Sequence, residues 1–241
     1  MPTPNYDLMR DYVNRQLISI FGLDNFELIF YGSFVRHQLS IGADADVLLI
    51  TKQNFSSKII QKLRDLQANF LKEFNFPLSL DANVMDDYKD LIQSSGHLLK
   101  FLSIKNDNVN RQDFWDRFSI NISQKNIAGF LLQKCLDVKR MFLFNLINQN
   151  PTGRIFKSDY NPQNISSITG YVVENFESLI KHILTDIELG EVSFLPLHEK
   201  KAIREKFVKL QKYRSVAAKT SKMIQLLDEI KLAVKKYSND I

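Results

Sequence analysis

The chain of 241 residues has little of what several protein classes depend on. Its one cysteine, Cys135, has no partner for an internal disulfide, which excludes a disulfide-stapled scaffold and agrees with a reducing cytoplasm. No stretch approaches the roughly 18 consecutive apolar residues that a membrane-spanning helix needs. Residues 1–15 carry neither an apolar core nor a small-residue cleavage site, so we expect no secretory signal. The expectation is a cytoplasmic protein without a membrane partner.

Two common nucleotide-binding loops are also missing. The chain has no Gly-x-x-x-x-Gly-Lys-Ser/Thr loop and no Gly-x-Gly-x-x-Gly fingerprint, which argues against a P-loop NTPase and a Rossmann oxidoreductase. Its histidines and its cysteine show no zinc-ligand spacing. What remains is an ordinary globular composition, with 44% hydrophobic and 24% charged residues.

The net charge of +5 is concentrated near the C-terminus. Residues 195–241 hold 12 Lys and Arg against 5 Asp and Glu, whereas residues 1–194 hold 20 against 22. The basic segment is either a set of solvated helical faces or a positive wall beside a polyanion such as a nucleoside triphosphate or RNA. Its only tyrosines are Tyr213 and Tyr237, so it offers few rings on which RNA bases would stack.

Hydrophobic periodicity divides the chain into two parts. The first part predicts helices and strands in alternation, with residues 97–104 open between a strand and a helix. The predicted helices are 6–21, 34–39 and 56–74, and the predicted strands are 26–31, 46–51 and 77–85.

After a polar segment at residues 105–111, the pattern predicts helices only. These helices span residues 123–148, 165–189, 197–213 and 216–237, and the last one carries a packing stripe formed by Met223, Leu227, Ile230, Val234 and Tyr237. Strand–helix alternation followed by helices alone predicts an α+β protein of two modules. We place the α/β module at residues 1–105 and the helical module at residues 106–241.

Two acidic residues open the second predicted strand. Side chains at i and i+2 of a strand point to the same face, so Asp44 and Asp46 are expected to project together. Paired carboxylates repel each other unless a cation lies between them, and oxygen-rich sites suit Mg²⁺ or Mn²⁺. Asp81, in the next predicted strand, is well placed as a third carboxylate for a two-metal site.

A glycine-serine pair ends the first predicted strand. Gly32 would let a phosphate approach the backbone, and Ser33 would begin the helix 34–39, whose N-terminus would bind an anion. Arg36 follows, either to contact a triphosphate or to lie on a solvated helix face. The plain alternative is that Asp44 and Asp46 form a polar turn and that Gly32-Ser33 only caps a helix.

Taken together, Gly-Ser-x(10)-Asp-x-Asp and a later strand Asp resemble the polymerase-β-type nucleotidyltransferase superfamily. The motif Tyr-Gly-Ser-Phe, the short core and the appended helices are similar to bacterial lincosamide and aminoglycoside nucleotidyltransferases and to minimal nucleotidyltransferases. The match spans residues 28–85. This resemblance implies a small mixed-sheet nucleotidyltransferase domain followed by an all-α helical bundle.

The resemblance also implies an activity: transfer of a nucleoside monophosphate from a metal-bound NTP to an acceptor hydroxyl, with release of pyrophosphate. The implied catalytic and metal-binding residues are Asp44, Asp46 and Asp81, with Mg²⁺ or Mn²⁺. The implied nucleotide-binding residues are Gly32, Ser33 and Arg36.

The acceptor stays open at this point. A small molecule such as an antibiotic is favoured, and RNA is an alternative through the basic C-terminal helices. The sequence departs from the family at Ala43, where a serine usually precedes the first aspartate. The competing hypothesis is therefore a non-catalytic module of the same fold that senses nucleotide or binds RNA or protein. Nucleotide binding without turnover would distinguish it, and a steep salt dependence would mark RNA binding.

Overall fold

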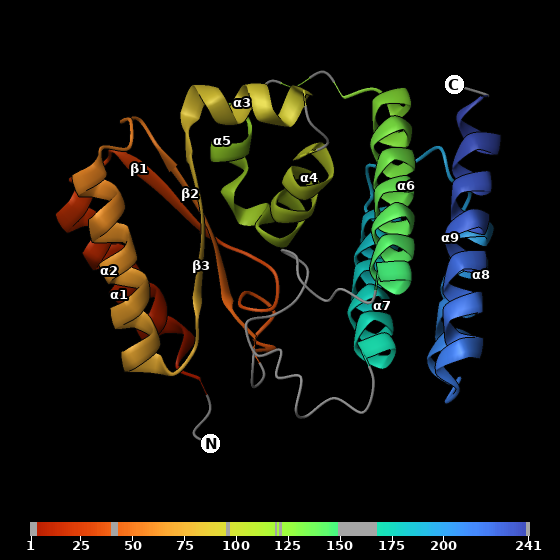
Figure 1. Ribbon diagram of the computed structural model, residues 1–241. Coiled ribbons are helices and arrows are strands. Elements are labelled where there is room, and N and C mark those ends of the chain that lie inside the picture. Colours follow the sequence, from red (N-terminus) through yellow and green to blue (C-terminus); the bar gives the residue numbers. More distant parts are fainter. Residues whose placement is uncertain are drawn as a thin grey trace. The chain divides into compact units, whose positions relative to one another are not determined.

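The computed structural model describes residues 4–39, 43–94, 97–118, 120, 122–148 and 168–239. The chain forms two compact units, and Figure 1 shows the elements of each. The first unit comprises residues 1–97 and 104–119, and the second comprises residues 98–103 and 120–241. The predicted α+β class is confirmed, because a mixed sheet with helices precedes a helical bundle.

The first unit is built on a three-stranded sheet in the order β1-β2-β3. Strand β1 (Phe26–Phe30) runs antiparallel to β2 (Ala45–Thr51), and β2 runs parallel to β3 (Leu78–Val84). The parallel pair is connected through helix α2 (Ser57–Phe74), as parallel strands require a crossover. All three strands agree with the predicted ranges to within one residue at each end.

Helices α1 (Tyr6–Phe21) and α2 cover one face of the sheet, while α3 (Met85–Ser94) and α5 (Gln112–Trp115) lie on its other side (Figure 1). Side-chain caps set both helix starts, because Asn5 accepts a hydrogen bond from the Leu8 amide and Ser56 accepts one from the Ile59 amide. The core between helices and sheet consists of residues from all these elements: Met9, Val13, Leu17, Phe21, Phe30, Val47, Leu49, Leu63, Leu66 and Phe70.

Several short elements differ from the prediction. Residues 32–37 form turns instead of the helix 34–39, and residues 97–104 belong to a helix, α4 (His97–Asp107). The sequence analysis did not predict α3 (Met85–Ser94) or α5 (Gln112–Trp115), which follows a 3₁₀ turn at Val109–Arg111.

The first unit also extends past the boundary expected after residue 105. Glu27 of β1 accepts hydrogen bonds from Arg111 at 2.6 Å and from Arg117 at 2.8 Å. The Phe118 ring packs edge-on against Tyr88 of α3, with ring centroids 5.7 Å apart. These contacts join residues 104–119 to the sheet, whereas residues 98–103 of α4 are part of the second unit.

The second unit is the predicted helical bundle. It contains α6 (Gln124–Asn148), α7 (Ile168–Ile187), α8 (Leu197–Gln211) and α9 (Val216–Ser238). Residues 165–167, predicted as the start of the helix 165–189, lie outside the described residues. Of the packing stripe predicted on α9, Met223, Leu227, Ile230 and Val234 are buried. No helix among the described residues has both the length and the apolar character needed to cross a membrane.

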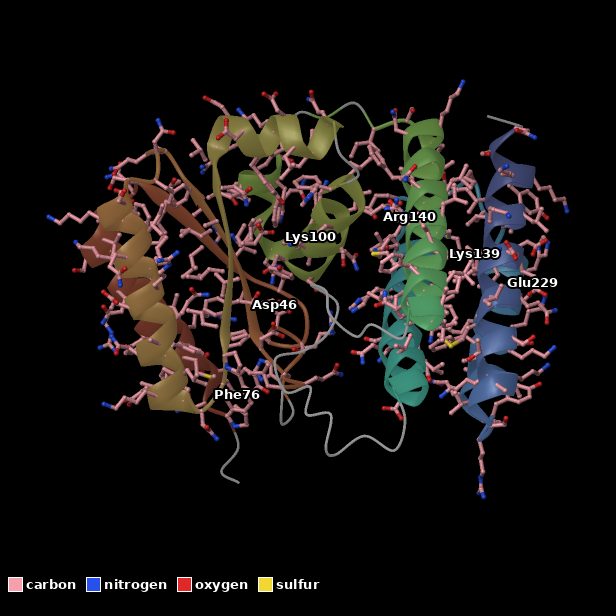
Figure 2. The ribbon with its side chains drawn as sticks, in the orientation of Figure 1. Asp46, Phe76, Lys100, Lys139, Arg140 and Glu229 are labelled. Carbon is pink, nitrogen blue, oxygen red and sulfur yellow. The ribbon has the colours of Figure 1, made fainter. Side chains whose placement is uncertain are left out.

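Ion pairs link the helices of the bundle. The Lys139 ammonium of α6 contacts the Asp228 carboxylate of α9 at 2.7 Å, and Figure 2 shows Lys139 on the side of α6 that faces α9. Lys134 of α6 pairs with Asp186 of α7, which is only 4% exposed. Burial raises the pKa of Asp186 above its ordinary value, and the Lys134 ammonium opposes that rise.

The two partners of this buried pair should respond differently to substitution. Lys134→Met leaves the Asp186 carboxylate buried without its cation, and we expect a loss of about 2 kcal/mol, because Lys134 is 35% exposed and the pair is partly screened. Asp186→Asn removes the buried charge, and its stability should stay near wild type. Urea unfolding at pH 7 measures both.

The pH dependence of Lys134→Met has a defined sign. A carboxyl with a raised folded-state pKa stabilises the fold while it is protonated, and this contribution is lost as pH rises through the folded pKa. The variant should therefore lose stability, relative to Asp186→Asn, as pH rises from about 4. Equal stability of the two variants at all pH values would contradict this account.

Candidate functional site

The three predicted carboxylates lie on or beside the sheet face opposite α1 and α2. Val47 and Leu49 of β2 point into the core beneath these helices, so the alternating residue Asp46 projects to the other face (Figure 2). In β3, Leu80 packs against the same core, so Asp81 projects to the face that carries Asp46. The parallel register sets Asp81 opposite Leu48, two residues along β2 from Asp46.

Tyr31 is affected by the charges of all three carboxylates. This residue follows β1, and its amide donates to the Asp46 carbonyl at 3.1 Å. Burial raises the pKa of the Tyr31 hydroxyl, and the negative charges of Asp46, Asp81 and Asp44 raise it further. All three carboxylates are therefore close enough to act on one phenol.

The carboxylates differ in exposure. Asp44 is exposed just before β2, while Asp46 and Asp81 are partly buried. Within the described residues, no group of three or more His, Cys, Asp or Glu side chains is gathered closely enough to hold a metal alone. The arrangement instead suits Mg²⁺, which is commonly held by one or two carboxylates together with waters and substrate phosphates.

The Gly32 backbone lies directly against this acidic group. Gly32 has φ of +65°, and a Cβ at this position would lie 3.0 Å from the Asp46 Oδ2 atom. Both the left-handed backbone and the close approach require glycine. The predicted proximity of the Gly-Ser turn to the aspartates is thus present in the structure.

Gly32→Ala should lower both stability and nucleotide binding. We expect a loss of about 1–3 kcal/mol, because alanine is strained at this φ and its methyl group would push against Asp46. Gly129→Ala is a matched control in helix α6, where no atom lies within 4 Å of the added Cβ. That change should stabilise the protein by about 0.5–1 kcal/mol. Thermal unfolding distinguishes the two variants. Equal shifts in melting temperature would contradict the conclusion that position 32 requires glycine.

Ser33 does not begin a helix, so the predicted helix N-terminus is wrong. The turn closes through a hydrogen bond from the Gln38 amide to the Ser33 carbonyl at 2.9 Å, and His37 has φ of +54°. A positive φ at His37 interrupts the helical repeat within one turn of Ser33. Any anion held here would bind to the amides and side chains of the turn, without a helix dipole.

Arg36, predicted as a phosphate ligand, is bound to a carboxylate of the chain itself. Its Nη1 atom donates to Asp107 Oδ1 at 3.1 Å and to Asp107 Oδ2 at 3.0 Å. The Gly32 amide donates to the same Oδ2 at 3.1 Å. Asp107 is the last residue of α4, and nothing in the polar segment 105–111 distinguishes it from the other polar residues there.

Sequence reasoning also missed two tyrosines of the site. Tyr31 precedes Gly32 in the Tyr-Gly-Ser-Phe motif, and Tyr88 lies in α3, which was not predicted. Burial raises the pKa of Tyr88, and the negative charge of Asp81 adds to the rise. Both phenols therefore stay protonated at neutral pH.

A cavity of about 790 Å³ lies beside β1. Arg10, Lys52, Asp107 and Arg117 are among its lining residues, and Asp44, Asp46 and Asp81 are not. The cavity therefore meets the candidate site through Asp107 and through Val35 of the turn.

The basic charge of the C-terminal helices is partly neutralised. Several of its cations are paired with carboxylates: Arg204 with Glu188, Lys206 with Glu229, Lys219 with Glu177, and Lys231 with Asp228. These pairs reduce the positive field available to a polyanion.

No known protein-family model matches the chain, and a search of curated proteins found no relative. The resemblance to nucleotidyltransferases therefore depends on the motif residues between Gly32 and Asp81 and on their placement in the fold.

Proposed function

We propose that the protein is a metal-dependent nucleotidyltransferase. The observation that supports this proposal is the Gly32 backbone against Asp46, with Asp81 on the same face of the neighbouring strand and the charges of Asp44, Asp46 and Asp81 all acting on Tyr31. The aspartates suit a divalent cation, and the adjoining turn at Gly32 suits the phosphates that would share this cation. The arrangement therefore supports chemistry at a nucleoside triphosphate.

In this proposal Asp44, Asp46 and Asp81, together with waters and the substrate phosphates, would hold Mg²⁺ or Mn²⁺, and the cation would neutralise the charge that develops on the phosphates. The Gly32 amide, Ser33 and Arg36 would donate hydrogen bonds to the phosphate oxygens. The chain's contribution is to position the triphosphate and to balance its charge.

The reaction joins an acceptor hydroxyl to the α-phosphorus of the NTP. The acceptor oxygen would form a bond to this phosphorus and give its proton to the Asp81 carboxylate, while the bond from the phosphorus to the pyrophosphate oxygen breaks and pyrophosphate leaves. Asp81, on the neighbouring strand, is the residue placed to orient the hydroxyl. A small-molecule acceptor is favoured over RNA because the basic helices are partly neutralised. A cytoplasmic setting, where Mg²⁺ and NTPs are available, suits this activity.

The test is calorimetric titration of each of the four NTPs with Mg²⁺, with pyrophosphate release followed in parallel. Metal-dependent binding of at least one NTP is expected, and pyrophosphate should appear when the correct acceptor is supplied. If no NTP binds with either Mg²⁺ or Mn²⁺, the proposal is wrong.

A nucleotide sensor without turnover is the second candidate. It is favoured by the Asp107 carboxylate, which lies on the Gly32 amide and Arg36, and by Ala43 in place of the usual serine. Single-turnover measurements distinguish the two. A sensor binds the NTP tightly and releases it unchanged, with every candidate acceptor and with water.

A further inference from the structure

The proposed phosphate-binding turn already holds an anion, the Asp107 carboxylate. Its Oδ2 atom accepts from the Gly32 amide at 3.1 Å and from Arg36 Nη1 at 3.0 Å, and its Oδ1 atom accepts from the same Nη1 at 3.1 Å. A backbone amide beside a guanidinium is also the donor set that a phosphate oxygen would use. Carboxylate and phosphate would therefore compete for one set of donors.

Asp107 is not placed there by the needs of its own helix. It is the last residue of α4, where the carbonyl end of the helix dipole disfavours a negative charge. The ion pair with Arg36 adds little stability, because the Arg36 side chain is 48% exposed. A contact that is weak and unfavourable to its helix can be broken at small cost.

We propose that Asp107 is an internal competitor that occupies the phosphate position of the Gly32–Arg36 turn until a nucleotide displaces it. This inference rests on the proposed function and adds its regulation. The apparent affinity for a triphosphate equals the intrinsic affinity multiplied by the fraction of molecules in which Asp107 has left the turn. Any event that withdraws Asp107 would activate binding without a change at the metal ligands.

A supporting role for Asp107 would change the affinity for phosphate in the opposite direction. If Asp107 only held Arg36 in place for the phosphate, removal of its charge would free the guanidinium and weaken binding. If Asp107 competes with the phosphate, its removal releases both the amide and the guanidinium. The sign of the change in affinity therefore separates the two roles.

The experiment measures binding of Mg-ATP and of inorganic tripolyphosphate to wild type, Asp107→Asn and Asp107→Ala. Both variants should bind tripolyphosphate about tenfold more tightly, as expected if roughly a tenth of wild-type molecules have a free turn. Asp113→Asn is the matched control, because it removes an exposed negative charge from the same segment. It should leave the affinity unchanged. Circular dichroism confirms that each variant is folded.

The outcomes distinguish this inference from the proposed function. Unchanged or weaker tripolyphosphate binding by both folded Asp107 variants overturns the competitor role, even if Mg-ATP binds and turns over. An equal gain in Asp113→Asn overturns it too, because the effect would then be one of net charge. Tighter tripolyphosphate binding in the Asp107 variants alone, with no NTP bound by any protein, supports the competitor and rejects the nucleotidyltransferase.

Discussion

Asp46→Asn is expected to reduce metal-dependent turnover on the order of 1,000-fold, or about 4 kcal/mol of transition-state stabilisation. Of the three proposed metal ligands, Asp46 lies nearest to the turn, since its Oδ2 atom is 3.0 Å from the position of a Cβ at Gly32. A cation bound to Asp46 would therefore be adjacent to the phosphates. The amide of asparagine keeps the shape of the side chain but not the charge that holds the cation.

The loss of turnover should not come from unfolding. Asparagine keeps the shape of the Asp46 side chain and removes one of several negative charges near this sheet face, which cannot increase like-charge repulsion. We expect the melting temperature of Asp46→Asn without metal to equal or exceed that of wild type. Added Mg²⁺ should raise the melting temperature of wild type more than that of the variant.

Asp87→Asn provides the control for this measurement. Asp87 lies exposed in the first turn of α3, within the same unit, and the substitution Asp87→Asn removes the same formal charge as Asp46→Asn. Its turnover should match wild type. Wild-type turnover by Asp46→Asn, with the NTP still bound in the presence of Mg²⁺, would show that the carboxylates are not the metal ligands.

The long elements of the fold could be predicted because their patterns are local. A buried strand such as β2 is a continuous apolar run, and a helix such as α9 repeats its apolar residues every three or four positions. The prediction of a helix at residues 34–39 was wrong because contacts with residues distant in the sequence set the conformation there. Phe34 is drawn into the core and His37 packs on the Tyr6 ring of α1.

The candidate site, like the fold, could be predicted only where it depends on residues close together in the sequence. Asp46 lies within β2, so its face follows from strand alternation, whereas Asp44 lies just before the strand and that rule does not extend to it. Asp107 reaches Gly32 across 75 residues of sequence, and Glu27 reaches Arg111 across 84. Such contacts depend on how α4 and the following turn pack, which no local pattern records. The same reason explains the late boundary of the first unit.

Phe34→Ala is the second change for which we expect a large effect, a loss of about 3–5 kcal/mol of folding free energy. Phe34 is fully buried. Its ring stacks on the Phe30 ring with the centroids 4.2 Å apart, and it meets the Tyr6 ring edge-on with the centroids 5.2 Å apart. The Arg10 guanidinium lies 5.8 Å from the ring centroid. Truncation would leave a cavity that these aromatic neighbours cannot fill without moving.

Urea unfolding measures this loss, with Leu232→Ala as the control. Leu232 is 61% exposed on α9, so its truncation should change stability by no more than about 0.5 kcal/mol. Phe34→Leu restores most of the buried volume and should recover more than half of the loss. Similar costs for Phe34→Ala and Leu232→Ala would mean that the Phe34 ring is not part of the core.

The same variant tests whether the turn depends on its aromatic anchor. Phe34 lies two residues after Gly32, and the Tyr6 hydroxyl accepts a hydrogen bond from the Leu39 amide at 3.1 Å at the far end of the turn. If Phe34 holds the turn in place, Phe34→Ala should weaken nucleotide binding at temperatures where the protein stays folded, and Phe34→Leu should restore it. Intact binding by folded Phe34→Ala would show that the backbone of the turn is held by its own hydrogen bonds and by Asp107.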